Sequence, residues 1–183
     1  MIVKQWIRLC FSWVRYRGNA LISYDAMKTS IKKMGQGENK ELDHFWYSVQ
    51  SFLVAVANIS KILWPSAPCV SGIPPELNTR RANLRALLSI DESSILKSRE
   101  FRNHFEHYDF RREECAKKAT DFTIVDSNVV PSYLIAGYSD NSKMRNFNPD
   151  AFVLTFGNRS YRFLAVVEGV RKLLDKTKSA VLK

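Results

Sequence analysis

The sequence has few of the residues that build disulfide frameworks and metal centres. Its 183 residues include only three cysteines and three histidines. Cys10, Cys69 and Cys115 stand far apart, and no two of them have the spacing of metal ligands. An odd and scattered set of thiols suits a reducing compartment. We therefore expect a cytoplasmic protein whose cysteines are small core or partly buried residues.

Long apolar runs and glycine clusters are also missing. The longest apolar run, residues 52–57, is far shorter than the roughly 20 residues that a membrane span needs, so stable membrane insertion is not expected. The seven glycines form neither a phosphate-binding loop nor a dinucleotide fingerprint, and no Gly-x-Ser-x-Gly elbow occurs. A kinase, a dehydrogenase and an α/β-hydrolase are therefore not expected.

Positive charge is in excess. The chain has 28 Lys and Arg against 18 Asp and Glu, a formal net charge of +10. This balance favours an anionic partner, with nucleic acid first and a membrane surface second, although a basic protein without such a partner fits the charge equally well. Residues 1–24 carry four basic and no acidic side chains among several aromatic ones. They predict a first helix that packs on its own domain or on a partner chain, or else contacts lipid or RNA.

Helical spacing of apolar residues dominates the rest of the chain. It is strongest over residues 38–63, and Pro65 and the prolines up to residue 75 predict a loop after that helix. Gly35 and Gly37 are expected to end the helix before it. Asp91 or Ser93 is a candidate N-cap for the helix that contains the histidines. The predicted helices cover residues 24–34, 38–63, 76–89, 94–118 and 160–178.

The pattern changes between residues 122 and 156. Residues 122–130 and 151–156 are rich in Thr, Ile, Val and Phe, and turn-forming residues lie between them. We expect one or two small β-hairpins or extended strands here, and Asn158 as the cap of the last helix. The sequence thus predicts a mainly α protein with a single domain over residues 1–183. Its architecture would be a helical bundle with a partly extended, hairpin-like insertion at about 122–156, before the last helix.

Residues 98–112 hold two of the three histidines together with four arginines. On a helix, Phe101, Phe105 and Tyr108 fall on one face, with Cys115 further along, and this face is expected to be core. Arg102, Glu106 and Asp109 form another row, in which the two acids can hold the guanidinium. His107 lies one row away.

This pairing of Arg with His is compatible with RNA cleavage. Histidine has a reference pKa of about 6.5, so it can take a proton from a ribose 2′-hydroxyl near neutral pH. Arginine is always charged and can stabilise a phosphate on which negative charge develops. Neither role needs a metal, and His104-Phe-Glu-His107 misses both known zinc-helix spacings. We therefore expect no metal and no cofactor.

Arg102 followed by Asn103 and, after three further residues, His107 resembles the signature of the HEPN superfamily, the higher eukaryotes and prokaryotes nucleotide-binding domain. The resemblance implies an all-α bundle and a metal-independent endoribonuclease that cleaves by 2′-hydroxyl attack, in a toxin or defence system. Arg102 and His107 would be the catalytic pair, and Asn103 would help to orient them. The active form would be a homodimer whose two motifs face one cleft, with an antitoxin or regulatory protein as a possible partner.

Further candidates come from the same segment. Glu106 and Asp109 are expected to support Arg102, and RNA is expected to contact the remaining basic residues, which are Arg99, His104, Arg111 and Arg112. Members of the superfamily that are modified by a nucleotidyltransferase antitoxin have Tyr two residues after the His. Asp109 takes that place here, so this form of control is not expected. Two alternatives stay open: a solvated, salt-bridged helix without a site, and a non-catalytic module that binds RNA, a nucleotide or a protein.

Overall fold

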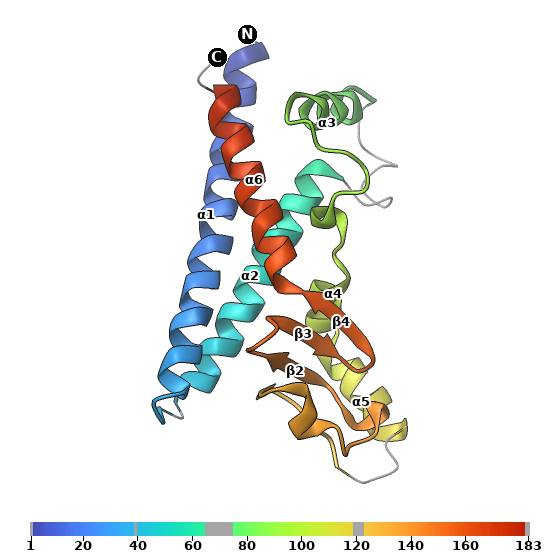
Figure 1. Ribbon diagram of the computed structural model, residues 1–183. Coiled ribbons are helices and arrows are strands. Elements are labelled where there is room, and N and C mark those ends of the chain that lie inside the picture. Colours follow the sequence, from blue (N-terminus) through green and yellow to red (C-terminus); the bar gives the residue numbers. More distant parts are fainter. Residues whose placement is uncertain (1, 39, 65–74, 119–122, 182–183) are drawn as a thin grey trace. The chain divides into compact units, whose positions relative to one another are not determined.

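The computed structural model describes residues 2–38, 40–64, 75–118 and 123–181, with the side chains of 2–15, 17, 75, 77 and 101 left aside. Six α-helices and one small sheet occur in these residues, which confirms a mainly α fold (Figure 1). The helices are α1 (Ile2–Met34), α2 (Glu41–Leu63), α3 (Pro75–Leu87), α4 (Glu100–Glu106), α5 (Tyr108–Lys118) and α6 (Phe163–Val181). No helix among the described residues is both long and apolar enough to cross a membrane.

The chain divides into two compact units, and each is considered by itself. Unit 1 comprises Met1–Tyr24, Ser51–Arg99 and Val166–Lys183, and unit 2 comprises Asp25–Gln50 and Glu100–Ala165. The prediction of one domain over residues 1–183 stays a prediction. The predicted loop at 65–75 falls almost wholly outside the described residues, as do Cys69 and Phe122.

In unit 2, the end of α1 is tied to the start of α2. Gly37 has a φ of +90°, which side chains rarely allow, so α1 ends where the two glycines predict. The carboxylate of Glu41, in the first turn of α2, accepts hydrogen bonds from Ser30 and Lys33 of α1, each at 2.9 Å. Charge and hydrogen bonding thus fix the hairpin between the two helices.

Unit 2 also contains a four-stranded sheet in the order β1-β2-β3-β4. The strands are β1 (Asn128–Val129), β2 (Arg145–Asn148), β3 (Val153–Phe156) and β4 (Arg159–Arg162), and only β1 pairs in parallel. The expectation of extended structure before the last helix is confirmed. The sheet carries short 3-10 helices between β1 and β2, η3 (Ser132–Ile135) and η4 (Asp140–Ser142).

The prediction that Asn158 caps the last helix is wrong. Gly157 and Asn158 form the two-residue turn between β3 and β4, because Phe156 pairs with Arg159 across it. Gly157 has a φ of +58°, as such tight hairpin turns require. Residues 159–162 therefore continue the sheet, and α6 begins at Phe163 instead of Ser160.

The predicted continuous helix over residues 94–118 is also wrong. Ser94 caps a short 3-10 helix, η2 (Ile95–Lys97), and Ser98 is extended. The hydroxyl of Ser60 in α2 donates to the Lys97 carbonyl at 2.8 Å. This carbonyl is therefore bonded to a side chain, whereas a continuous helix would bond it to its own backbone. Helix resumes as α4 and α5, which meet at His107. The chain thus presents His104 on α4 and His107 at the junction of two short helices, in place of one long helix.

Aromatic side chains form the core of unit 2. Phe45 of α2 packs on Phe147 of β2 with ring centroids 5.0 Å apart, and Trp46 lies 6.2 Å from Phe105 of α4. Phe105 in turn lies 6.4 Å from Phe156 of β3. Phe105 and Cys115 are buried as predicted. These contacts hold α4 and α5 against the sheet.

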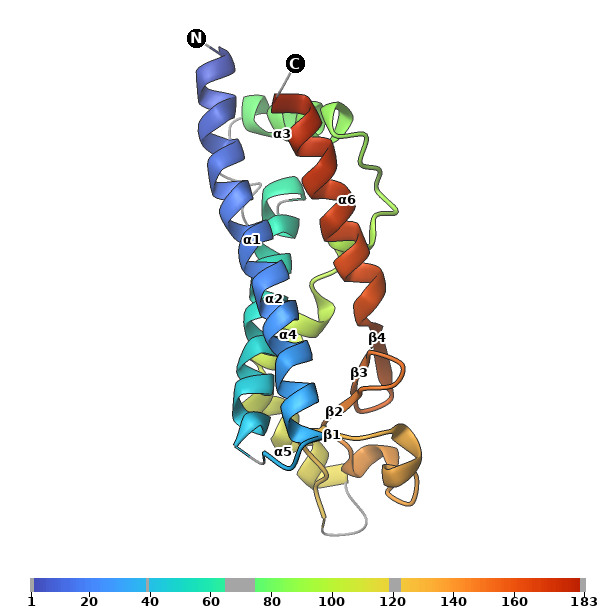
Figure 2. The same ribbon diagram turned by 60° about the vertical axis from the view of Figure 1, so that its left-hand side comes forward.

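In unit 1, α6 packs closely on η2. A Cβ added at Gly169 would lie 3.2 Å from a side-chain carbon of Ile95 and 3.3 Å from Leu96, so the helix approaches η2 because this residue has no side chain. Lys176 of α6 also donates to the Ser89 carbonyl at 2.8 Å. Figure 2 shows α1 and α6 running in opposite directions within this unit. The apolar stripe predicted for the last helix is buried from residue 163 to residue 173.

Candidate functional site

Arg102 lies on α4 and is held by its neighbours. Its guanidinium forms an ion pair with Glu106, one turn later, and donates to the side-chain oxygen of Asn103 at 3.2 Å. The Arg102 side chain is 20% exposed, whereas that of Glu106 is 38% exposed. The structure therefore brings three of the predicted site residues together, with the arginine in a fixed position near the surface.

His107 lies at the junction of α4 and α5 and is exposed. Its N–H donates to the Asn103 carbonyl at 3.1 Å, and its carbonyl accepts from the Arg111 N–H at 3.0 Å, so helical hydrogen bonding passes through the junction. Five residues correspond to about 140° around a helix. The guanidinium of Arg102 is paired with Glu106, on its own helix α4.

Three other predicted residues lie apart from this group. Asp109 and Arg112 are exposed on α5, and Arg99 is half-buried before α4 begins. In the residues that the structure describes, Asp109 makes no ion pair with Arg102, so Glu106 alone of the two predicted acids holds the guanidinium.

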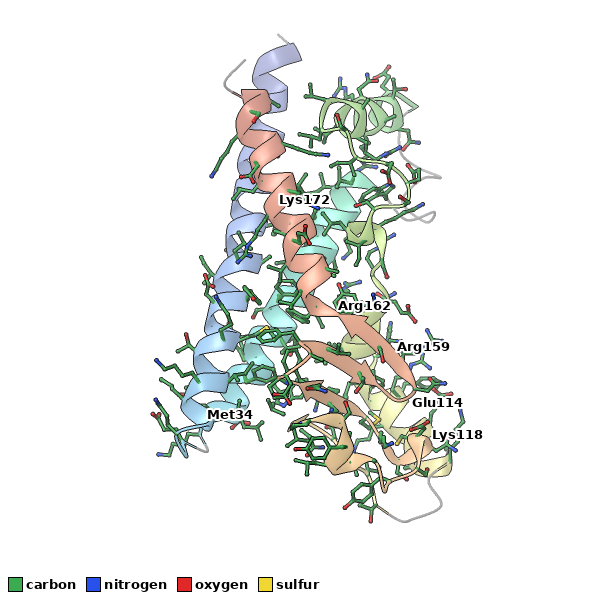
Figure 3. The ribbon with its side chains drawn as sticks, viewed as in Figure 1. Met34, Glu114, Lys118, Arg159, Arg162 and Lys172 are labelled. Atoms are coloured by element: carbon green, nitrogen blue, oxygen red, sulfur yellow. The ribbon has the colours of Figure 1, made fainter. Side chains whose placement is uncertain are left out.

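His104 and Arg111 line a pocket between α5 and the sheet. It encloses about 360 Å³, near the lower end of the range of about 300–1,000 Å³ for small-molecule sites. One wall comes from the helices, which contribute His104, Arg111, Glu114, Cys115 and Lys118. The opposite wall comes from η4, from the residues that follow it and from the β3–β4 turn. Figure 3 shows Glu114 and Lys118 of α5 and Arg159 of β4 gathered at the same edge of unit 2.

The pocket carries more positive than negative charge. Four of its residues are cationic, Arg111, Lys118, Lys143 and Arg159, against the two carboxylates of Glu114 and Asp140. Glu114 lies 2.8 Å from Arg111 and 3.7 Å from Lys118, so a single negative charge is shared between two cations. An anion is the ligand that this balance favours.

His104 forms part of the buried wall of this pocket. Its ring stacks on Phe156 with centroids 5.0 Å apart and planes 19° apart. Burial lowers the pKa of His104, and the positive charges of Arg111 and Arg159 lower it further, against the opposing charge of Glu100 at 3.8 Å. Both effects disfavour the charged form of this imidazole.

Cys115, at the inner end of the pocket, is not an activated nucleophile. Burial raises the pKa of its thiol, and the sulfur donates to the Asn141 carbonyl at 2.8 Å. A nucleophilic cysteine needs the opposite shift. The expectation of a partly buried, structural thiol is confirmed for this cysteine.

A second charged cluster, which no sequence motif predicts, supports α5. Arg145 of β2 pairs with Asp126 through two contacts, Nε to Oδ1 at 2.9 Å and Nη2 to Oδ2 at 2.6 Å. Its guanidinium lies 4.3 Å from the ring centroid of Tyr108, whose hydroxyl donates to Asp126 at 2.9 Å. The pair is 19 residues apart, so no local spacing reveals it.

The pocket was missed for the same reason. Lys118, Lys143 and Arg159 come from three different elements and follow no motif. One local feature does point to the pocket. A Gly-Asn dipeptide between two short strand-forming segments, as at Gly157-Asn158, is typical of a hairpin turn, and it predicts that Arg159 lies on a strand.

No model of a known protein family, no curated protein and no solved structure matches this chain. Among the described residues, no group of three or more His, Cys, Asp or Glu side chains is placed to hold a metal ion.

Proposed function

We propose that this chain is a metal-independent endoribonuclease of the HEPN type. The observation that carries the proposal is the arrangement of Arg102 and His107 on α4 and at its end. The guanidinium is held by Asn103 and Glu106, and the imidazole is exposed to a substrate. The mainly α fold and the net charge of +10 agree with it.

In the proposed reaction, His107 takes the proton of a ribose 2′-hydroxyl. The resulting oxygen attacks the adjacent phosphorus, the bond to the 5′-oxygen breaks, and this oxygen leaves with a proton from solvent water, after which His107 returns its own proton to solvent. Arg102 stabilises the negative charge that develops on the phosphate. Nη2 of Arg102 pairs with Glu106 and Nη1 donates to Asn103, so the guanidinium has further N–H groups for the phosphate while these two contacts hold its position.

A homodimer of helical bundles completes the proposed site. In this dimer, a second copy would bring its own Arg102 and His107 into the same cleft. The second copy would also cover Phe110, a large apolar side chain that is 58% exposed one helical turn after His107. A toxin or defence effector of this kind would also need an antitoxin or another regulatory partner.

The proposed chemistry is tested with an RNA oligonucleotide that carries one 2′-deoxyribose at the cleaved position. We expect the full chain to cleave the unmodified strand in EDTA and leave a 2′,3′-cyclic phosphate. The deoxy substitution should stop cleavage there, because the attacking oxygen is absent. Cleavage at the deoxy position would rule out the mechanism.

A non-catalytic module that binds RNA, a nucleotide or a protein is the second candidate. The engagement of Arg102 by Glu106 favours it, because the guanidinium is already occupied by an acid. This candidate predicts RNA binding that weakens with salt, without cleavage by the wild type or by His107→Ala.

A further inference from the structure

The pocket between α5 and the β3–β4 turn is built by the sheet, which the Arg102–His107 motif does not involve. Its walls come from α4, α5, η4 and the hairpin turn, all within unit 2. We propose that this pocket binds the phosphate group of a nucleotide or of an RNA strand. The proposal stands whether or not the chain cleaves RNA.

The donors around the pocket are those that bind phosphate. Arg111 and Arg159 supply guanidinium groups, which match the geometry of phosphate oxygens, and Lys118 and Lys143 supply ammonium groups. The Nε of Arg111 is buried and has no acceptor among the described residues, whereas its Nη1 donates to Glu114. The Nε–H of Arg111 is thus an unsatisfied buried donor beside the pocket.

The acids of the pocket do not close it to an anion. Arg159, which is 57% exposed, pairs with Glu100, and Lys143 pairs with Asp140 at 3.0 Å. Glu114 divides its charge between Arg111 and Lys118, and Lys118 is 62% exposed. Ion pairs this exposed hold their partners weakly, by at most about 1 kcal/mol. A phosphate carries up to two negative charges and three strong acceptor oxygens, so it competes with Glu114 for both bases.

The pocket wall behind the cations offers a phosphate a hydrogen-bonding ring, that of His104, and adds no further charge. His104 lies beside Arg111 and Arg159, whose charges help to keep it neutral. A phosphate between these arginines would offset their charge and raise the pKa of His104. The turn residue Gly157 leaves the backbone open there, because a Cβ on it would lie no closer than 3.9 Å to the Lys143 carbonyl.

The proposal is tested by calorimetry on the full chain with inorganic phosphate, adenosine 5′-monophosphate and adenosine. Two uncleavable 2′-O-methyl oligonucleotides, with and without a 5′-phosphate, complete the set. Arg159→Gln and Lys118→Gln remove one pocket charge each. Arg162→Gln is the matched control, because it removes the same charge from the same strand but from a residue that does not line the pocket (Figure 3).

We expect adenosine 5′-monophosphate to bind and adenosine not to bind. Each pocket variant should weaken binding about tenfold, as the loss of a charge-assisted hydrogen bond does, and Arg162→Gln should bind as the wild type does. Tighter binding of the 5′-phosphorylated oligonucleotide than of the mononucleotide would identify an RNA end as the source of the phosphate, and equal binding would identify the nucleotide. Equal affinity for adenosine and its monophosphate, equal losses in all three variants, or no binding by any probe would overturn the proposal.

Discussion

Arg145 and Asp126 form a two-contact ion pair that joins the sheet to α5, with the guanidinium over the ring of Tyr108 and the carboxylate bonded to the hydroxyl of that tyrosine. The side chains of the pair are 20% and 18% exposed. Both the junction at His107 and the pocket wall rest on α5. The position of the proposed sites therefore depends on this pair.

Asp126→Asn should lower the free energy of unfolding by about 2 kcal/mol, because it removes the charge that compensates a partly buried guanidinium. Urea denaturation followed by circular dichroism measures the loss. Asp140→Asn is the control, since its carboxylate is 70% exposed and its ion pair with Lys143 should contribute less than about 1 kcal/mol. Equal losses in the two variants would show that the Asp126 pair is an ordinary surface contact.

Acid should weaken the fold through the same pair. Burial alone would raise the pKa of Asp126, but the hydrogen bonds and charge of Arg145 lower it to about 2 from an ordinary value of 3.8. Because the folded-state pKa is depressed, this stabilisation is present above the ordinary value and is lost as the pH falls through about 2. The difference in unfolding free energy between wild type and Asp126→Asn should shrink over this interval. A difference that stays constant from pH 6 to the acid limit of the fold would contradict the assignment.

Glu106 should act as a positioning residue for Arg102. Glu106→Ala removes the partner of the guanidinium and should reduce RNA cleavage by about tenfold, through kcat more than KM. Glu106→Gln should recover part of the loss, because its amide oxygen still accepts a hydrogen bond from Arg102. Glu113→Ala on α5 is the matched control and should cleave as the wild type does. Full activity in Glu106→Ala would remove Glu106 from the site.

Gly157 should be essential to the β3–β4 turn. Its φ of +58° is unfavourable for residues with a branched side chain, so Gly157→Val should cost roughly 1–2 kcal/mol of unfolding free energy. Gly157→Asn should cost less, because asparagine tolerates this conformation. Gly137→Ala is the control, since a Cβ there meets nothing within 4 Å and φ is not positive. Thermal unfolding ranks the three, and equal stability of the Val and Asn variants would contradict the role of the turn.

Features set by local chemistry were predictable from the sequence. The end of α1 follows from Gly35 and Gly37, and the buried stripe of α6 follows from its apolar spacing. The burial of Phe105 and Cys115 follows from their shared helix face. Each of these depends on residues within a few turns of one another, so no knowledge of the tertiary fold was needed.

Features set by distant partners were not predictable. The break before α4 depends on Ser60, which takes the Lys97 carbonyl from 37 residues away in the sequence. The pocket depends on cations from helix, loop and strand that only the fold brings together. Asn158 is a different case, because the Gly-Asn turn was readable but asparagine also caps helices. The local sequence is compatible with either a turn or a helix cap at Asn158. Pairing of residues 159–162 with β3 selects the turn.

Incubation of the full chain with labelled RNA in EDTA, beside Arg102→Ala, His107→Ala and Arg162→Gln, tests the proposed ribonuclease most directly. We expect cleavage by the wild type and by Arg162→Gln, and none by the other two variants, because the proposal assigns the chemistry to Arg102 and His107. Equal cleavage by all four proteins, or by none of them, would contradict the proposed catalytic pair.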